Sequence, residues 1–214
     1  MTILITGANR GIGKGLTDGY VARGETVIAT ARAADGCLPL DVSDPASVAA
    51  LAERLQGQAI DTLICNAGIY PDKGQSLDHG YPPDMWAEVF AVNVTGVFLT
   101  VQALLPNLSM AAAPKIAIIS SQMGSDTRAP GGSYIYRASK AAALNLGRNL
   151  ATDLRPRGIA VGIYHPGWVR TDMGTDAAEI GPEDSVTGLI DRFDALSLET
   201  TGCFETWDGR AHPY

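Results

Sequence analysis

The sequence predicts one doubly wound α/β domain with a mainly parallel sheet of about seven strands flanked by helices. Strand-like and helix-like segments alternate along the chain, which is the order that produces such a sheet. Several strand-like segments are continuous apolar runs, as expected of strands buried on both faces. With 214 residues, of which 46% are hydrophobic, the chain can bury a sizeable core, and we assign residues 1–214 to a single domain.

Each element has a local signal in the sequence. The first strand, at residues 2–6, ends in a glycine-rich turn that starts a helix at 11–23. A strand at 26–31 and a short one at 38–40 precede a helix that Asp44 caps, Pro45 opens and residue 55 ends. A Pro/Gly-rich stretch, residues 70–83, is interpreted as a surface loop. The remaining strands are expected at 62–65, 115–120, 159–164 and 201–207, and the remaining helices at 85–108, 133–155 and 182–196.

Composition and charge exclude several classes of function. The net charge is -7 and no cluster of Lys or Arg is present, which argues against a nucleic-acid partner. The cysteines Cys37, Cys65 and Cys203 form no CxxC pair, so neither disulfides nor a zinc site is expected, and no His/Asp/Glu cluster indicates a catalytic metal. No uninterrupted apolar run approaches the roughly 18 residues of a membrane span. Residues 3–5 are too short a run for a signal peptide, so we expect a cytoplasmic protein without a membrane partner.

The turn after the first strand has the composition of a phosphate-binding loop. It reads Thr6-Gly7-Ala8-Asn9-Arg10-Gly11-Ile12-Gly13 and leads into a helix. The glycines let the backbone turn sharply and approach a ligand, and the helix N-terminus offers free N–H groups to a pyrophosphate. The spacing differs from the general G-x-G-x-x-G fingerprint, so a purely structural turn is the alternative. Its position after the first strand favours a Rossmann-type dinucleotide site.

The end of the second strand predicts which dinucleotide binds. NAD-binding proteins usually place an acid there, whereas this strand ends Thr30-Ala31-Arg32. Arg32 is a planar fork suited to a 2′-phosphate, and Arg10 in the glycine turn is a second cation. Either arginine alone is more typical of a solvated surface. Together with the missing acid they predict NADP (NADPH) rather than NAD.

Tyr136 and Lys140 form a candidate acid–base pair. They lie at positions i and i+4 of a predicted helix and therefore share one face. A nearby ammonium favours the phenolate, which makes Tyr136 a better proton donor or acceptor near neutral pH. Tyr134 has Ala138 at the matching position, so it lacks such a partner. An exposed polar pair without catalytic role is the alternative.

These features belong to a larger set of motifs that occur in order along the chain. With them, the sequence resembles the short-chain dehydrogenase/reductase family over essentially its whole length. The ending Gly202-Cys203-Phe204…Trp207-Asp208-Gly209…Pro213-Tyr214 is similar to the C-factor/Sniffer-type carbonyl reductase branch. The motifs are Thr6-Gly7-x-x-x-Gly11-x-Gly13, Asp41-Val42, Asn66-Ala67-Gly68, Asn93-Val94-Thr95-Gly96, Ser120-Ser121, Tyr136-x-x-x-Lys140 and Pro166-Gly167-Trp168-Val169-Arg170-Thr171.

The resemblance implies a role for each member of the catalytic set Asn93, Ser121, Tyr136 and Lys140. Tyr136 is implied to be the general acid that protonates a carbonyl oxygen, or the base in the reverse direction. Lys140 is implied to bind the nicotinamide ribose and to favour ionised Tyr136. Ser121, rather than Ser120, is implied to hold the substrate oxygen. Asn93 is implied to hold a water that links Lys140 to solvent.

Cofactor contacts are expected along the glycine turn and after several strands. By resemblance, Asp41 and Val42 contact the adenine, residues 66–68 line the adenosine and ribose, and residues 166–171 flank the nicotinamide. The full expected set is Gly7, Asn9, Arg10, Gly11, Ile12, Gly13, Arg32, Asp41, Val42, Asn66, Ala67, Gly68, Tyr136, Lys140, Pro166, Gly167, Val169 and Thr171. Candidate substrate contacts are Gln122, Met123, Tyr134 and Trp168, with Tyr70 as a further candidate.

Three departures from the family pattern are visible. The stretch from Arg32 to Asp41 is too short for the helix that usually separates the second and third strands. The loop between Ser121 and Tyr136 is slightly longer than is common. The segment from Thr171 to Pro182 is short, so the lid over the substrate is expected to be small.

The expected function is that of an NADPH-dependent oxidoreductase that transfers a hydride to an aldehyde or ketone. Its partner is then a small-molecule carbonyl or alcohol substrate. One alternative is an NAD(P)-dependent alcohol dehydrogenase that works oxidatively with the same residues. Another is a nucleotide-binding signalling or redox-sensor protein, which would not need the complete catalytic set. The helices at 89–105 and 141–150 have apolar faces, for which burial within one chain is one interpretation. The family resemblance implies instead that they form the interface of a homo-oligomer, either a dimer or a tetramer.

Overall fold

The computed structural model describes residues 1–174 and 178–214, which form an α/β domain around one sheet. The sheet has seven strands in the order β3-β2-β1-β4-β5-β6-β7, and every neighbouring pair is parallel. Strand order reverses between β1 and β4, which marks the switch point where ligands bind in such sheets. The predicted fold class is confirmed, and the sheet is parallel throughout rather than mainly parallel.

The strands lie where the apolar runs predict them. The strands from β1 to β6 each lead into a connection that runs to a helix, except β2, where turns replace the helix as the short Arg32–Asp41 stretch predicts. The last strand is shorter than expected, and β6 begins and ends one residue later than expected. The bounds are β1 (Thr2–Thr6), β2 (Thr26–Ala31), β3 (Leu38–Pro39), β4 (Thr62–Cys65), β5 (Lys115–Ile119), β6 (Ala160–His165) and β7 (Phe204–Thr206).

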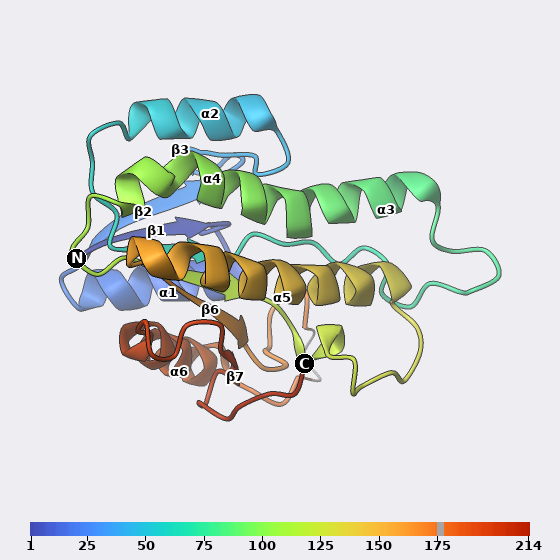
Figure 1. The fold of residues 1–214 in the computed structure, drawn as a ribbon. Coiled ribbons are helices and arrows are strands. Elements are labelled where there is room, and N and C mark those ends of the chain that lie inside the picture. The colour runs from blue at the N-terminus through green and yellow to red at the C-terminus, as the bar shows by residue number, and fades with distance from the viewer. Residues whose placement is uncertain (175–177) are drawn as a thin grey trace.

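Helices cover both faces of the sheet (Figure 1). On one face lie α1 (Gly11–Ala22) and α6 (Pro182–Ala195), which pack on each other. On the other lie α2 (Pro45–Arg54), α4 (Gly96–Leu108) and the long α5 (Tyr134–Leu154). Short 3-10 turns η2 (Gln122–Gly124) and η3 (Arg155–Arg157) flank α5 in the sequence. The two helical layers and the sheet between them make the three-layer arrangement of a doubly wound fold.

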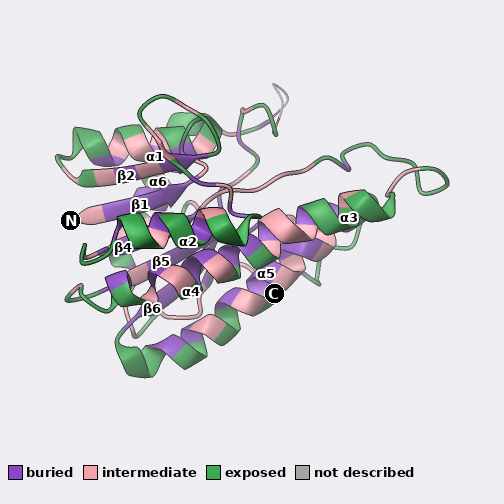
Figure 2. Cartoon of the chain, turned by 90° about the horizontal axis from the view of Figure 1, so that it is seen from above, coloured by how far each residue is buried: buried purple, intermediate pink, exposed green. Residues whose placement is uncertain are grey.

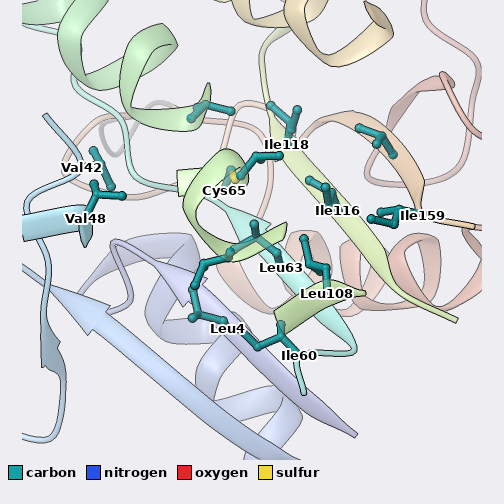
Figure 3. Close-up of a cluster of buried hydrophobic side chains, with 14 of the residues drawn as sticks. Leu4, Val42, Val48, Ile60, Leu63, Cys65, Leu108, Ile116, Ile118 and Ile159 are labelled. Atoms are coloured by element: carbon teal, nitrogen blue, oxygen red, sulfur yellow. The ribbon is translucent and has the colours of Figure 1, made fainter. Parts of the chain in front are cut away.

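The core is split by the sheet into two apolar clusters. Successive residues of β1 point to opposite faces, so Leu4 packs with α2 and α4 whereas Ile5 packs with α1 and α6. The first cluster, which includes Leu63, Cys65 and Ile116, is drawn in Figure 3. Figure 2 shows the central strands largely buried and the outer helix faces exposed. This double burial explains why the strands are continuous apolar runs in the sequence.

The helix expected at residues 85–108 is divided into three parts. It consists of α3 (Pro83–Phe90), a π-helical turn η1 (Ala91–Thr95) and α4. A π turn adds a residue to the helical repeat and rotates the side chains that follow, and such turns are frequent at functional sites. Here the inserted turn carries Asn93, which is buried. The 3.6-residue periodicity used for the sequence prediction does not detect this insertion.

The stretch Pro83–Leu108 is long and apolar enough, by length and composition alone, to cross a membrane. Counting uninterrupted apolar residues does not single it out, because Asp84, Glu88 and Asn93 interrupt the run. In the fold its C-terminal part packs on the sheet through Val101 and Leu104, which are fully buried. A core helix meets the same length and composition test.

Candidate active site

The glycine turn is shaped by close backbone approaches. Gly7 has a φ of +67°, a conformation that residues with a Cβ rarely adopt. A Cβ on Gly13 would lie 2.2 Å from the carbonyl oxygen of Gly7, so no larger residue fits there without moving backbone. The turn leaves space for a ligand to approach the N-terminus of α1 directly. These residues fit a pyrophosphate-binding cradle.

Asn66 braces this turn from the end of β4. Its side-chain amide donates hydrogen bonds to the carbonyl oxygens of Thr6 and Gly7, both at 3.0 Å. The hydroxyl of Thr6 in turn accepts hydrogen bonds from the backbone N–H groups of Asn66 and Ala67. Asn66 therefore holds the turn in shape as well as lining the space beside it, a structural role that the sequence does not reveal.

A groove of about 450 Å³ runs along the carboxyl ends of the strands beside the glycine turn. It is lined by all the expected cofactor contacts except Gly167 and Val169. Gly167 lies instead against Ile180 and Trp207, and Val169 is buried in a bridge to Ile180. Lining residues that the sequence did not single out are Ala31, Ala33, Leu40, Ser43, Ile69, Glu88, Val92, Ile119, Asp172 and Met173.

One end of the groove is formed by residues after β2 and β3. Arg32 is exposed there, and an acid is present nearby after all, because Asp41 follows β3. Hydrogen bonds from the hydroxyl and the backbone N–H of Ser43 lower the pKa of Asp41, and the charge of Arg32 lowers it further. The carboxylate of Asp41 is thus held as an anion that faces Ser43, and Arg32 remains the cation of this end.

Arg10 does not stand free in the groove. Its guanidinium is paired with Asp172 at 3.1 Å, and both side chains are largely exposed. The pair links the glycine turn to the segment that follows β6. Arg10 must exchange this partner if it is to bind a phosphate, so the expected second cation for the 2′-phosphate is less available than Arg32.

Ser121, Tyr136 and Lys140 converge beside the groove. Tyr136 and Lys140 lie on the buried face of α5, and the Lys140 ammonium lies 5.6 Å from the centre of the Tyr136 ring. Ser121 follows β5, and its hydroxyl accepts a hydrogen bond from the backbone N–H of Met123 at 3.1 Å and lowers the pKa of Tyr136. The neighbouring Ser120 instead donates to the backbone oxygen of Lys140 at 2.9 Å. The two serines therefore differ in position: the Ser120 hydroxyl faces the backbone of α5, and the Ser121 hydroxyl faces the start of η2.

Burial dominates the electrostatics of this cluster. Burial raises the pKa of Tyr136, and the hydrogen bond to Ser121 offsets only part of the rise. Burial also lowers the pKa of Lys140 to about 8, and its ammonium donates to the Ile119 carbonyl oxygen at 2.9 Å. We expected Lys140 to favour the phenolate of Tyr136. In this structure the lysine is directed at a backbone oxygen, and the desolvated tyrosine stays protonated.

The lowered pKa of Lys140 predicts a pH dependence of stability. The unfolded chain keeps this lysine protonated up to about 10.5, whereas the folded chain releases the proton near 8. Because the unfolded state binds more protons in that interval, stability rises with pH there, by up to about 3 kcal/mol. Denaturant unfolding of the wild type and of Lys140→Met between pH 7 and pH 10.5 measures it. The stability difference between the two should move in favour of the wild type as pH rises, and a constant difference would contradict the prediction.

Asn93 has all its amide groups engaged. Its side-chain oxygen accepts from the N–H of Ile69, and its side-chain N–H₂ donates to the oxygens of Ile69 and Ser139. A Cβ on Gly68 would lie 3.3 Å from the Asn93 oxygen and 3.5 Å from the Lys140 ammonium, so both groups flank the same space. Asn93 thereby ties η1 to the segment after β4 and to α5.

The candidate substrate residues lie outside the groove lining, around the loop after β5 and the segment after β6. Gln122 accepts a hydrogen bond from Arg128, and Met123 is half-buried in η2. Tyr134 packs edge-on against Tyr81 and is 39% exposed. Trp168 is 43% exposed and its indole N–H donates to the Gly174 oxygen.

Tyr70 is the candidate substrate residue nearest the catalytic pair. Its ring stacks on that of Tyr136 at a centroid distance of 4.1 Å. Its hydroxyl lies 2.5 Å from the hydroxyl of Ser133, the residue before α5. Tyr70 therefore covers one face of the tyrosine ring and is fixed at its far end.

The parallel sheet, with its switch point and glycine turn, defines the protein as a Rossmann-like α/β domain. The short chain dehydrogenase family model matches residues 1–180, and the chain belongs to this family of oxidoreductases. The predicted family resemblance is confirmed.

Individual relatives agree with this assignment. A 1-hydroxy-2-glutathionyl-2-methyl-3-butene dehydrogenase of Rhodococcus sp. (strain AD45) is 36% identical, with 97% of each chain covered. An NADPH-bound carbonyl reductase from chicken fatty liver superposes with a TM-score of 0.89 at 31% identity, over 100% of this chain and 98% of that one. The carbonyl reductase Sniffer of D. melanogaster superposes with a TM-score of 0.93 at 26% identity, over 100% and 99%. The expected similarity to the Sniffer-type branch is thus also confirmed.

Proposed function

We propose that the protein is an NADPH-dependent reductase of small aldehydes or ketones. The observation that carries the proposal is that Tyr136 and Lys140 line the strand-end groove together, with the hydroxyl of Ser121 lowering the pKa of Tyr136. Bound NADPH would supply the hydride, and the protein would supply position and a proton. The glycine turn, where a Cβ on Gly13 meets backbone at 2.2 Å, supports a cofactor that lies directly on the main chain.

The residues divide the proton chemistry among them. Tyr136 keeps its proton because it is buried, and a hydroxyl that stays protonated at neutral pH suits a general acid for carbonyl reduction. Ser121 would hold the substrate oxygen beside that hydroxyl, where negative charge develops. Lys140, with its pKa near 8, would bind the nicotinamide ribose and return a proton to Tyr136 after each turnover. Asn93 would keep η1 and α5 in register around this path.

Cofactor preference follows from Arg32. Arg32→Ala should weaken NADPH binding by about tenfold to a hundredfold, the usual size of a charge-assisted contact to phosphate, and leave NADH binding almost unchanged. Titration of protein fluorescence with each cofactor measures both affinities. Arg10→Ala serves as the comparison, because Arg10 is already paired with Asp172 and should have the smaller effect. Equal losses for NADPH and NADH in Arg32→Ala would contradict the NADP assignment.

The direct test of activity is a panel of aldehydes, ketones and quinones, each followed by the loss of NADPH absorbance with NADH in parallel. Turnover of at least one carbonyl class with NADPH supports the proposal. NADPH binding without turnover of any carbonyl or alcohol contradicts it and favours a nucleotide sensor. A preference for oxidation is the second candidate, since the Rhodococcus relative is named as a dehydrogenase of a hydroxy compound. Alcohols with NADP⁺ therefore belong in the panel.

We also propose that two or four copies associate through α4 and α5. Both helices carry apolar side chains that the domain leaves only partly buried, such as Leu105 and Leu146, and Phe98 of α4 is 39% exposed. Such faces gain from contact with a second copy. Light scattering on the purified protein should give a mass of two or four times 22.4 kDa. A mass of 22.4 kDa at micromolar concentration would contradict the association.

A further inference from the structure

The N-terminus of α5, which carries the proposed catalytic tyrosine, is held by a residue far away in the sequence. Ser133, at the N-cap position, has a left-handed backbone with a φ of +50° and makes no side-chain cap. One oxygen of Asp72, Oδ2, accepts hydrogen bonds from the backbone N–H groups of Ile135 at 2.9 Å and of Tyr136 at 3.2 Å. A carboxylate from the segment after β4 thus takes the place of the usual local cap.

Asp72 is fully buried, and its other oxygen, Oδ1, has no hydrogen-bond partner among the described residues. Burying a carboxylate is unfavourable unless its contacts compensate for the lost water. The contacts that compensate here are the two amides at the start of α5 and the positive end of the helix dipole. Asp72 does not line the groove, so its burial has no cofactor contact to explain it. What Asp72 holds is the first turn of the catalytic helix.

The same segment also touches the side chain of Tyr136. Tyr70 stacks on the Tyr136 ring at 4.1 Å and reaches Ser133 with its hydroxyl. Two residues later, Asp72 binds the backbone N–H of Tyr136 itself. The residues between β4 and α3 therefore fix the orientation of the Tyr136 ring and the position of the Tyr136 backbone. A shift of about 1 Å in a reacting group can cost about a hundredfold in rate.

We propose that Asp72 is a positioning residue for carbonyl reduction, which sets the Tyr136 hydroxyl at its working place by anchoring the first turn of α5. The inference rests on the proposed role of Tyr136. It assigns a function to a buried carboxylate that neither touches the groove nor belongs to the motifs found in the sequence.

Three variants separate this role from a general loss of stability. Asp72→Asn keeps an oxygen for both amides, and its N–H₂ group takes the place of the oxygen that has no partner. Asp72→Ala removes the acceptor, and the hydroxyl of Asp72→Ser ends one bond short of the two amides. Asp78→Ala is the matched control, because Asp78 is exposed in the same loop. Each variant is assayed for kcat per bound NADPH, for carbonyl KM and for NADPH affinity.

We expect Asp72→Ala and Asp72→Ser to lose at least tenfold in kcat while NADPH affinity stays within about twofold of the wild type. Asp72→Asn and Asp78→Ala should keep kcat within about threefold, so the asparagine rescues what the alanine loses. Because kcat is counted per bound NADPH, a fraction of unfolded protein does not imitate the effect. If the alanine variant does not fold, the serine and asparagine variants decide.

Two outcomes would overturn the inference. One is wild-type kcat in Asp72→Ala or Asp72→Ser, since the contact would then not matter for turnover. The other is an equal loss in the serine and asparagine variants, since the acceptor for the two amides would then not be the cause. Tyr136→Phe is assayed beside them. If that variant keeps full turnover, the proposed function fails, whereas a dead Tyr136→Phe with unaffected Asp72 variants overturns the positioning role alone.

Discussion

Tyr136→Phe is expected to lower kcat for carbonyl reduction by about a hundredfold to ten-thousandfold, the usual contribution of a positioned proton donor. NADPH affinity should stay within about threefold, because the phenylalanine ring keeps the stack with Tyr70 and removes only the hydroxyl. The variant separates proton donation from cofactor binding, since the aromatic ring that lines the groove is kept. Steady-state kinetics and a fluorescence titration with NADPH measure the two quantities.

Tyr214→Phe is the matched control for this substitution. Its hydroxyl donates to the carbonyl oxygen of Gly202, neither residue lines the groove, and loss of the hydroxyl should leave kcat unchanged. If Tyr136→Phe turns over at the wild-type rate, the assignment of the acid is wrong. If it loses NADPH binding together with turnover, the hydroxyl acts on the cofactor rather than on the substrate.

The second large effect is expected from Gly13→Ala, which should lower NADPH affinity by at least about a hundredfold. The added Cβ would lie 2.2 Å from the Gly7 oxygen and 2.5 Å from the side-chain nitrogen of Asn66. The first atom belongs to backbone and the second is tied to that backbone by two hydrogen bonds, so neither can move without opening the turn. The turn would then no longer present its N–H groups to a pyrophosphate.

Gly19→Ala, in the same helix, is the control for Gly13→Ala. Its added Cβ would meet the Cδ1 atom of Ile190 at 2.7 Å, which is the far end of a side chain that can turn away. Calorimetric titration with NADPH should detect no binding to Gly13→Ala and wild-type binding to Gly19→Ala. Undiminished binding in a folded Gly13→Ala protein would show that the cofactor does not lie on this turn.

The sheet could be predicted closely because its strands carry a local signal. Residues 3–5 and 63–65 are uninterrupted apolar runs, and burial on both faces of a parallel sheet favours that pattern. The glycine turn was predictable for a similar reason, since positive φ and close backbone contact exclude most other residues at Gly7 and Gly13. A structural feature can be predicted from a single sequence when it requires one residue type at one position.

Other features depend on contacts between distant segments. Asp72 caps a helix that begins 62 residues later, counting to Tyr134, and no spacing rule connects the two. Arg10 and Asp172 are 162 residues apart in the sequence. Their ion pair therefore cannot be predicted from the sequence, although it occupies Arg10 in the fold. The pKa values of Tyr136 and Lys140 also depend on such contacts, because burial raises the first and lowers the second, and the sequence alone does not show that burial.

The proposed reduction requires that Tyr136 give a proton to the carbonyl oxygen while NADPH gives a hydride to the carbonyl carbon. The most direct measurement uses NADPH deuterated at the nicotinamide C4 position with a carbonyl that the wild type reduces, followed by mass spectrometry of the alcohol. We expect the wild type to place one deuterium on the carbinol carbon, and we expect almost no deuterated alcohol from Tyr136→Phe. Two results would contradict this proposal. One is alcohol that carries no deuterium with either stereoisomer of the labelled cofactor, and the other is an equal yield of alcohol from the wild type and from Tyr136→Phe.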